Sequence, residues 1–481
     1  MKNRKLKFRL EGAAFAAMVI AAVILLNLVA GVLGDKYDLK ADLTGGGVFT
    51  LSNETKEVIS AIDKEIMIYY ATNASSRNSR YKEILEEFEK SSEFISVTEV
   101  NIDIDPGFTR QYQIKSYNSV VVESADTGKK RVVDNSMIEQ SLVNDNGIEN
   151  NKVNYLEGYV AAAIRYVMGT EPLMVYIAMG HGEVIENPSM LDYLMNMLYA
   201  EGMSVKIIDL TTDELPEDAD MLLFAGPTTD FSDTEIEKID DYLEIGGRVQ
   251  YYSNPSYELS NINDYFKQNW GITVNSDCVS DKNSGYIAQS LSGNYLIPVI
   301  NEHAITSYLR STGANLRVLE GDTNSIEITE KDGIEANVLV STSESGVSMT
   351  REAWVQKNNR ENYSVTKEGK QNISVYLRKN PLYNEETTAR LLVSGSCYML
   401  FDRYFDATGG YGDKDLVIKS INYMSGIEDA PVSVASKNVV KEKMEILDQN
   451  TLGVYIALLV GVIPAIMFAY GIYVFVRRHC L

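Results

Sequence analysis

The chain has 481 residues, enough for two or three domains, and 45% of them are hydrophobic, as is ordinary for a folded protein. It carries 44 Lys and Arg against 67 Asp and Glu, and a net charge of −23 repels phosphate backbones, which argues against nucleic-acid binding. The three cysteines have neither metal-ligand spacing nor the density of a disulfide framework, and a Cys278–Cys397 bridge stays open. The sequence has no Walker A pattern, which excludes ATP hydrolysis by that route.

The first element is an apolar segment at residues 12–34, which contains no charged side chain. As a helix it is long enough to cross a hydrocarbon core of about 30 Å. Basic residues dominate positions 1–11, so the positive-inside rule places that end in the cytoplasm. A cleaved signal peptide is the alternative, but the apolar stretch is long for one and lacks a convincing cleavage site. We therefore predict an uncleaved transmembrane helix.

A second apolar segment, residues 452–476, lies near the other end of the chain and is followed by Arg477 and Arg478. The same rule puts residues 477–481 in the cytoplasm. Between the basic ends, residues 12–476 hold 37 basic and 66 acidic residues, a net charge of −29. The sequence thus predicts a two-pass cell-membrane protein with both termini inside and a large acidic extracytoplasmic region, joined to the second span by a linker at 431–451.

Residues 35–150 are predicted to form a small α/β domain. After a glycine-rich lead-in, the expected elements are a helix that starts at Ser52, a strand at 65–71, a helix at 81–88, a strand at 94–104 and a hairpin at 118–134. The sequence Asp105-Pro106-Gly107 is read as a turn. This order suggests a thioredoxin-like domain, but the absence of a C-x-x-C motif excludes thioredoxin chemistry.

Residues 151–430 are predicted to form a second α/β domain. Its expected elements are a helix at 153–169, a strand at 173–178, a helix capped by Ser189 and ended by Gly202, strands at 205–210 and 221–225, a helix opened by a Ser232/Glu235 capping box, and a strand at 248–252. This alternation predicts a doubly wound, flavodoxin-like parallel sheet. Residues 280–390 form a less regular insertion, and a buried strand within 390–400 could complete the sheet.

The stretch MGHGE follows the first strand of this domain. In open α/β sheets the carboxyl ends of the strands form the ligand crevice. Two further strands end at the same edge, so we expect one candidate ligand-binding crevice there, made of Gly180, His181, Gly182, Glu183, Gly226, Pro227, Thr228 and Asn254.

Four roles are considered for His181 in this loop. Catalysis would need a serine or cysteine nucleophile on a strand-to-helix elbow, and the sequence AGPTTD offers none. Metal binding is not expected, because His303 is the one other histidine of the extracytoplasmic region. Ligand contact remains open, and so does a structural role in which the glycines permit a tight turn while His181 and Glu183 bond neighbouring loops. The structural role is the favoured interpretation.

Several of these motifs together resemble the auxiliary proteins of gliding-motility-type (GldG-like) ABC transporters. The resemblance rests on the GHGE turn, the PEDADMLLFAGP run, the S-x-x-E helix and the GGR strand, and covers most of residues 45–425. Two segments depart from the family pattern: Ala304 stands where proline is common, and Ser396 replaces an acidic residue, which puts any site built on that acid in doubt. The resemblance implies an ATPase and a permease as partners, and a glutamine-amidotransferase-like second domain without the catalytic triad.

The sequence is therefore interpreted as a non-catalytic extracytoplasmic accessory subunit of an ABC transporter, without cofactor or metal. It would act by binding the permease, an envelope glycan or a small ligand. The alternatives are a transporter-independent envelope glycan-binding protein and a degenerate hydrolase.

Overall fold

The computed structural model describes residues 50–143, 149–183, 188–290, 293–313, 315–359, 362–379, 388–400, 412–427, 437–438 and 470–471. The predicted membrane spans fall outside these residues, except for Tyr470 and Gly471, which are helical. Among the described residues, no helix has both the length and the apolar character needed to cross a bilayer.

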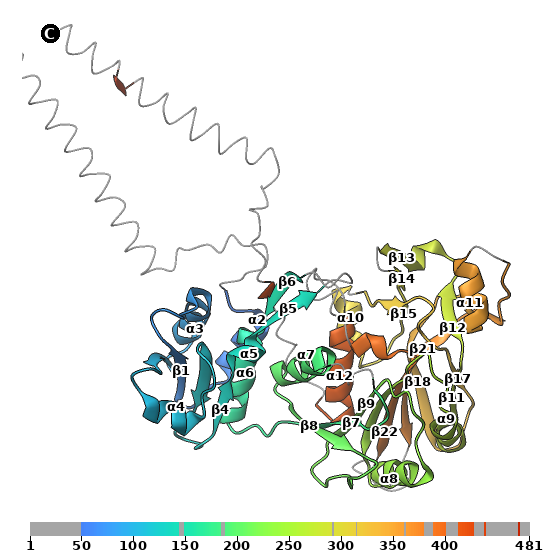
Figure 1. Cartoon of the computed structure of the whole chain (residues 1–481), viewed down its shortest axis with the longest axis horizontal. Helices are drawn as coiled ribbons and strands as arrows, with labels where there is room; N and C mark the ends of the chain where they lie inside the picture. Colours follow the sequence, from blue (N-terminus) through green and yellow to red (C-terminus); the bar gives the residue numbers. More distant parts are fainter. Residues whose placement is uncertain are drawn as a thin grey trace, which may run out of the picture. The chain divides into compact units, whose positions relative to one another are not determined.

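A four-stranded sheet forms the core of the first part, and its strand order is β2-β1-β3-β4. Strand β1 (Ile66–Thr72) runs parallel to β2 (Ile95–Asn101) and antiparallel to β3 (Ser119–Glu123), which pairs with β4 (Lys130–Val133). The apolar faces of three helices pack with this sheet into one cluster (Figure 1): α2 (Asn53–Ser60), α3 (Ser79–Ser91) and α6 (Leu156–Val167). The sheet, α2 and α3 lie within the predicted small α/β domain, whereas α6 comes from the segment assigned to the second domain.

Local sequence signals explain how these elements begin and end. The Ser52 side chain accepts a hydrogen bond from the Thr55 amide and caps α2, as predicted. The predicted turn at Asp105-Pro106-Gly107 is wrong, because these residues open helix α4 (Pro106–Tyr112). The Asp105 carboxylate accepts a hydrogen bond from the Phe108 amide at 2.9 Å. Proline is tolerated at a first helical position, since that amide has no partner inside the helix.

A small sheet with the order β23-β6-β5 lies next in the chain. After the short helix α5 (Asn135–Ile138), β5 (Glu139–Val143) pairs with β6 (Glu149–Asn154), and β23 (Lys437–Asn438) pairs antiparallel with the end of β6. The predicted loop at 144–150 lies outside the described residues up to position 148, and its last two residues belong to β6. Residues from the predicted 431–451 linker therefore return to the strand that precedes α6.

The largest sheet has a parallel core in the order β8-β7-β9-β10-β22. These strands are β7 (Met174–Met179), β8 (Ser204–Asp209), β9 (Met221–Ala225), β10 (Arg248–Tyr252) and β22 (Ala389–Ser394). The four strands predicted between 173 and 252 are thus confirmed as parallel neighbours, and the 390–400 segment completes the sheet as expected.

The sheet extends beyond the predicted parallel core, because the irregular insertion adds antiparallel strands to it. Strand β21 (Asn372–Lys379) runs antiparallel to β22 and carries β17 (Ile326–Ile328) and β18 (Ile334–Ser341) on its other side. Strand β11 (Ile272–Val274) pairs with β17, and β15 (Val299–Ile300) pairs with β18. An apolar strand pattern reports burial and contains no information about strand direction, so the sequence could not distinguish the two arrangements.

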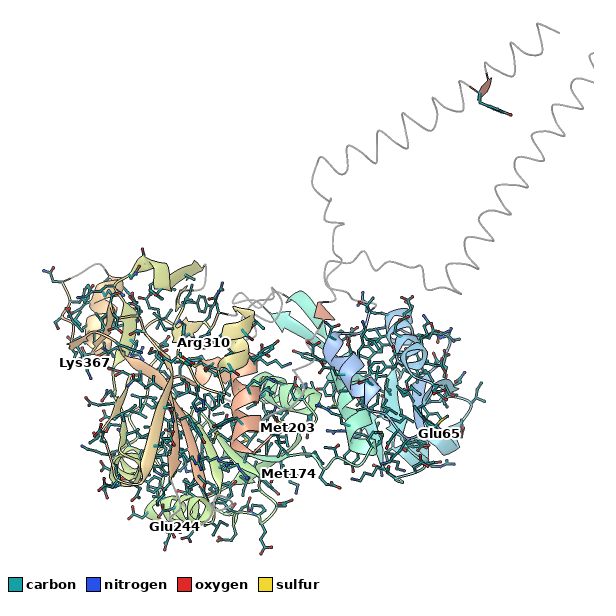
Figure 2. The ribbon with its side chains drawn as sticks, turned by 180° about the vertical axis from the view of Figure 1, so that it is seen from behind. Glu65, Met174, Met203, Glu244, Arg310 and Lys367 are labelled. Carbon is teal, nitrogen blue, oxygen red and sulfur yellow. The ribbon has the colours of Figure 1, made fainter. Side chains whose placement is uncertain are left out.

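Helices cover both faces of the large sheet, as a doubly wound fold requires. Alternate residues of β7 point to opposite faces: Val175 and Ile177 join one apolar cluster, while Tyr176 and Ala178 join another. Helices α7 (Pro188–Ala200) and α12 (Asp413–Met424) cover the first face, and α8 (Asp233–Glu244) and α9 (Ser260–Tyr265) cover the second (Figure 1). Figure 2 labels Met174 at the start of β7 and Glu244 at the end of α8.

The ends of α7 and α8 test three predictions about helix boundaries. Helix α7 begins at Pro188, so Ser189 is the second residue of the helix and the prediction that it caps the helix is wrong. The fixed φ of proline suits the first residue of a helix. Gly202 follows its C-terminus with φ of 85°, the predicted role. The Ser232/Glu235 capping box at α8 is confirmed, and Gly246, with φ of 93°, follows the end of that helix.

The remainder of the insertion forms short peripheral elements. Two small sheets have the orders β12-β19-β20 and β13-β14-β16. Their strands are β12 (Cys278–Asp281), β13 (Ile287–Ser290), β14 (Gly293–Leu296), β16 (Val318–Leu319), β19 (Gly346–Met349) and β20 (Lys367–Glu368). The short helices are η2 (Phe266–Trp270), η3 (Ser284–Tyr286), α10 (Ser307–Thr312), α11 (Arg351–Asn358) and η5 (Cys397–Leu400).

Candidate functional site

The GHGE loop leaves the carboxyl end of β7 in a conformation that needs both of its glycines. Gly180 has φ of 113° and Gly182 has φ of 67°, a region that side-chain-bearing residues rarely adopt. Space is also restricted: a Cβ atom on Gly180 would lie 2.6 Å from Oδ1 of Asp209, and one on Gly182 would lie 2.4 Å from Oγ1 of Thr228. The loop is therefore a tight turn that approaches the ends of two neighbouring strands.

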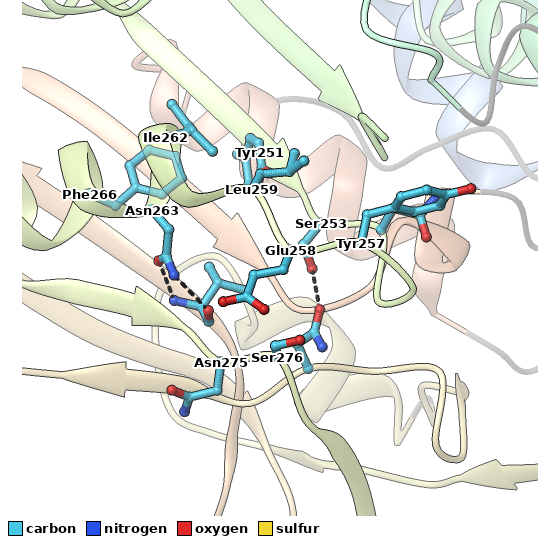
Figure 3. A pocket seen from close by; sticks show the side chains of 13 residues that line it. Tyr251, Ser253, Tyr257, Glu258, Leu259, Ile262, Asn263, Phe266, Asn275 and Ser276 are labelled. Carbon is cyan, nitrogen blue, oxygen red and sulfur yellow. Dashed lines mark hydrogen bonds between the residues drawn. The ribbon is translucent and has the colours of Figure 1, made fainter. Parts of the chain in front are cut away.

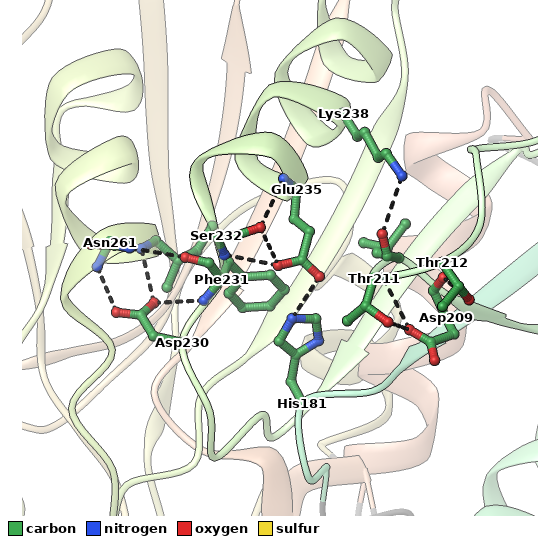
Figure 4. Close-up of polar contacts among 12 residues, drawn as sticks. His181, Asp209, Thr211, Thr212, Asp230, Phe231, Ser232, Glu235, Lys238 and Asn261 are labelled. Atoms are coloured by element: carbon green, nitrogen blue, oxygen red, sulfur yellow. Dashed lines mark hydrogen bonds and ion pairs between the residues drawn. The ribbon is translucent and has the colours of Figure 1, made fainter.

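The turn directs the His181 imidazole inward, where 2% of the residue is exposed. Its ring stacks on Phe231, with ring centroids 4.2 Å apart and an interplanar angle of 25°. Nε2 lies 3.1 Å from Oε1 of Glu235 (Figure 4). Nδ1 lies 3.5 Å from Oε1 of Glu183. Both carboxylates are buried as well, at 6% and 2% exposure. The imidazole is thus enclosed by one phenyl ring and two acids.

Glu235 reaches this position because it belongs to the first turn of α8. Its Oε2 accepts hydrogen bonds from the amide and the hydroxyl of Ser232, at 2.8 and 2.7 Å, and completes the capping box. Its other oxygen faces His181. Glu183 similarly bonds within its own loop, where Oε2 accepts the His181 amide proton at 2.9 Å. Each carboxylate therefore has one oxygen on a backbone amide and one toward the imidazole.

These charges determine the protonation of the cluster. Burial lowers the pKa of His181, but the carboxylates of Glu183 and Glu235 raise it by more, and the net pKa lies above its ordinary value of 6.5. For Glu235, burial raises the pKa, while the bonds from Ser232 and the imidazole charge lower it to a net value below 4.5. The negative charge of both carboxylates favours the protonated imidazole, so the ion pairs hold the loop against the first turn of α8.

The structure brings most of the predicted crevice residues together. The amides of Thr228 and Thr229 both donate to the carbonyl of His181 at 2.9 Å, and Oγ1 of Thr228 donates to the carbonyl of Gly182 at 3.0 Å. Gly226, with φ of 71°, donates its amide to the carbonyl of Tyr252. Gly226 and Pro227 are buried. These hydrogen bonds join the loop after β7 to the loop after β9.

Asn254 lies in a separate pocket at the end of β10 (Figure 3). The pocket extends toward α9 and is lined in part by Tyr251, Tyr257 and Asn263. Oδ1 of Asn254 accepts a hydrogen bond from the amide of Ser256 at 3.2 Å. The free volume of about 20 Å³ accommodates about one water molecule. A ligand role for Asn254 and the crevice residues remains a prediction.

Sequence reasoning missed two members of the His181 cluster, Glu235 and Phe231. The capping-box spacing identified Glu235 as a helix-capping residue. That spacing does not predict which residue its second carboxylate oxygen contacts. Elsewhere, Nδ1 of His303 accepts the Ile305 amide proton, and the Ser396 hydroxyl donates to the carbonyl of Asp322. Within the described part of the chain, no group of three His, Cys, Asp or Glu side chains could hold a metal ion.

Comparison with protein families decides the identity. Residues 173–420, more than half of the chain, match the family described as "ABC-type uncharacterized transport system". The chain belongs to this family. Residues 46–139 match a second family, described as "Domain of unknown function (DUF7088)". As a member of the first family, the protein is an auxiliary component of an ABC-type transport system, and that system is its partner.

Comparison with curated proteins found no match. Among solved structures, the chain is similar to the mmIFT52 N-terminal domain, with 16% identity, a TM-score of 0.37, and coverage of 52% of this chain and 97% of that one. A putative ThuA-like protein from Parabacteroides merdae has 9% identity, a TM-score of 0.30, and coverage of 53% and 90%. The NTD_N/C domain of alkylhydroperoxide reductase AhpF from Enterococcus faecalis has 15% identity, a TM-score of 0.19, and coverage of 33% and 77%. These similarities carry no argument about function.

Proposed function

We propose that this family member is a non-catalytic, extracytoplasmic accessory subunit of its transporter. Membrane helices at 12–34 and 452–476 would anchor it with both termini in the cytoplasm, and the region between them would bind the permease or an envelope ligand. The gliding-motility type is the proposed subgroup. The basic flanks of both apolar segments and the family membership support this proposal.

The observation that carries the proposal is that the segments at Ser52 and at Lys437, far apart in the sequence, contact neighbouring residues. On entry, the Ser52 amide donates to Oε1 of Glu157, at the start of α6, at 2.6 Å. On exit, β23 pairs with the end of β6, with Lys437 opposite Asn154. Asn154 and Glu157 are three positions apart in the sequence. The described segments at Ser52 and at Lys437 therefore lie beside the same strand-to-helix junction, and this supports the proposal of two membrane helices.

The contacts of His181 support a structural role for this residue over a catalytic one. The side chains in contact with the imidazole are two carboxylates and a phenyl ring, and both carboxylates also bond backbone amides. A residue held this way stabilises the fold. Turnover of any substrate by the full chain that disappears in the folded variant His181→Ala would show instead that the loop is catalytic.

Copurification tests the proposal directly. The full chain, tagged at one end and extracted in mild detergent, should retain an ATPase and a multi-span permease in a constant ratio, identified by mass spectrometry. A tagged two-pass protein from the same membrane, expressed at the same level, is the control. Recovery of the folded chain without transporter subunits, under conditions that keep other transporters intact, would contradict the proposal.

A further inference from the structure

A second cavity lies away from the His181 cluster and has the dimensions of a small-molecule site. Its free volume is about 280 Å³, close to the lower end of the range for ligand pockets. Its walls come from the C-terminal end of α6, the connection from α6 to β7, the turn between α7 and β8, and the end of α12. Arg165, Tyr166, Thr170, Gly202 and Asn422 are among the lining residues.

Arg165 provides the first cation of this cavity. Its Nη2 donates to the carbonyl of Glu201 at 2.9 Å. A Cβ atom on Gly202 would lie 3.2 Å from the same nitrogen, so the glycine leaves room for the guanidinium to lie across the turn. Burial lowers the pKa of Arg165, and the Glu201 carboxylate raises it by less. A guanidinium stays protonated, and a half-buried one gains stability from a further anion.

Arg131 provides a second guanidinium at the same turn. Its Nη2 donates to the carbonyl of Met203, a lining residue, at 3.3 Å, and its Cζ lies 5.7 Å from the ring centroid of Tyr166. Met203 is labelled in Figure 2. Burial lowers the pKa of Arg131. The two guanidinium groups donate to carbonyls two residues apart in the same turn, those of Met203 and Glu201.

Two lysines add to the positive charge, and each has a carboxylate of its own. Nζ of Lys129 lies 2.5 Å from Oε1 of Glu171, and Nζ of Lys414 lies 3.1 Å from Oε1 of Glu201. The hydrogen bonds described for the guanidinium groups, by contrast, go to backbone carbonyls. This concentration of cations occurs in a region, residues 12–476, whose net charge is −29.

We propose that this cavity binds a small ligand through an oxyanion, a carboxylate or a phosphate, held by Arg165 with Arg131 in support. Guanidinium groups present paired N–H donors that match the oxygens of both anions. The inference goes beyond the proposed function and does not depend on it, because it concerns what the extracytoplasmic region binds and not which membrane proteins it joins.

Calorimetric titration of the full chain in detergent, at constant ionic strength, tests the site with two probes, inorganic phosphate and succinate. At least one should bind saturably. Binding of phosphate alone would identify a phosphate-bearing ligand, binding of succinate alone a carboxylate-bearing one, and binding of both a general oxyanion site. Binding of neither would overturn the proposal.

Thr170 provides the decisive variants, because it lines the cavity and its side chain is exposed. Thr170→Glu adds a negative charge that should weaken binding at least about tenfold. Thr170→Gln adds a side chain of the same shape as glutamate but without the charge, and it should change the affinity by less than about twofold. Arg165→Gln should abolish binding, and Arg310→Gln, at an exposed arginine, should not. Equal affinity in Thr170→Glu and Thr170→Gln would overturn the assignment even if Arg165→Gln failed to fold.

Discussion

Nε2 of His181 lies 3.1 Å from Oε1 of Glu235, and this contact joins the loop after β7 to the first turn of α8. The second oxygen of Glu235 accepts two hydrogen bonds from Ser232 and caps the same helix. One carboxylate thus connects two segments that lie on the same edge of the large sheet. The contact explains why a histidine that looks catalytic in the sequence is buried in the fold.

Loss of the Glu235 charge should destabilise the protein. Glu235→Gln keeps an oxygen for the cap but leaves the buried imidazole with a weaker partner, and we expect a cost of about 1–3 kcal/mol in the free energy of unfolding. Glu237→Gln, at an exposed position of the same helix, is the matched control and should cost less than about 0.5 kcal/mol. Thermal unfolding followed by circular dichroism measures both. Equal midpoints for the two variants would show that the ion pair contributes nothing.

The pKa shifts predict the pH range in which the cluster stabilises the fold. The pKa of His181 is raised, so its contribution is complete below the ordinary value of 6.5 and is lost as pH rises through the folded-state pKa. The pKa of Glu235 is lowered, so its contribution is complete above 4.5 and is lost as pH falls through its folded-state pKa. Both are present between about pH 4.5 and 6.5.

Unfolding midpoints measured from pH 4 to 9 should therefore decline above pH 6.5 in the wild type. His181→Gln should flatten that decline and lower the midpoint within the stabilising range. The buried position also changes the expectation for His181→Ala, which would leave folding intact only if the imidazole faced solvent. Because 2% of His181 is exposed, the substitution should lower the free energy of unfolding by about 2 kcal/mol. An unchanged pH profile in His181→Gln would contradict the assigned pKa shift.

Gly180→Ala should destabilise the loop by about 2 kcal/mol or more, and Gly180→Val by more still. The φ of 113° strains any side chain, and a Cβ atom would meet Oδ1 of Asp209 at 2.6 Å. That oxygen cannot move freely, because it accepts hydrogen bonds from the amide and hydroxyl of Thr211. Gly128→Ala is the control: its φ of 69° is also positive, but the added atom has open space. Similar losses of stability in the two alanine variants would show that crowding is unimportant.

Thiol labelling tests the proposed topology, and the structure makes the experiment more selective. Cys278 and Cys397 are free and buried, and burial raises the pKa of Cys278 to about 11 and that of Cys397 further, so both should be inert in the native protein. A membrane-impermeant maleimide applied to intact cells should leave the chain unlabelled, because Cys480 is predicted to be cytoplasmic. Lys367→Cys, at an exposed position, should label readily and serves as the positive control. Labelling of Cys480 before cell lysis would refute the topology.

The sequence by itself determined the elements whose signals are local. The Ser52 cap, the Ser232/Glu235 capping box and the strands Met221–Ala225 and Arg248–Tyr252 were all predicted with the boundaries observed. Such signals depend on neighbours within one or two helical turns, or on a continuous apolar run, so a single segment contains all the information. The parallel direction of the strands from β7 to β10 followed from the helices between them in the sequence. A helix that connects two strands of one sheet usually leaves them parallel, with a right-handed crossover.

Only the tertiary structure decided which distant residues meet. It added β21 to the sheet in the antiparallel direction, placed Glu235 against His181, and brought Ser52 and Lys437 to Glu157 and Asn154. It also assembled Arg131 and Arg165 around the turn that contains Glu201 and Met203. The sequence could not reveal these contacts because an apolar pattern specifies that a side chain is buried, not its partner. The partner depends on strand order and register, and these depend on how all segments of the chain bury their apolar surfaces together.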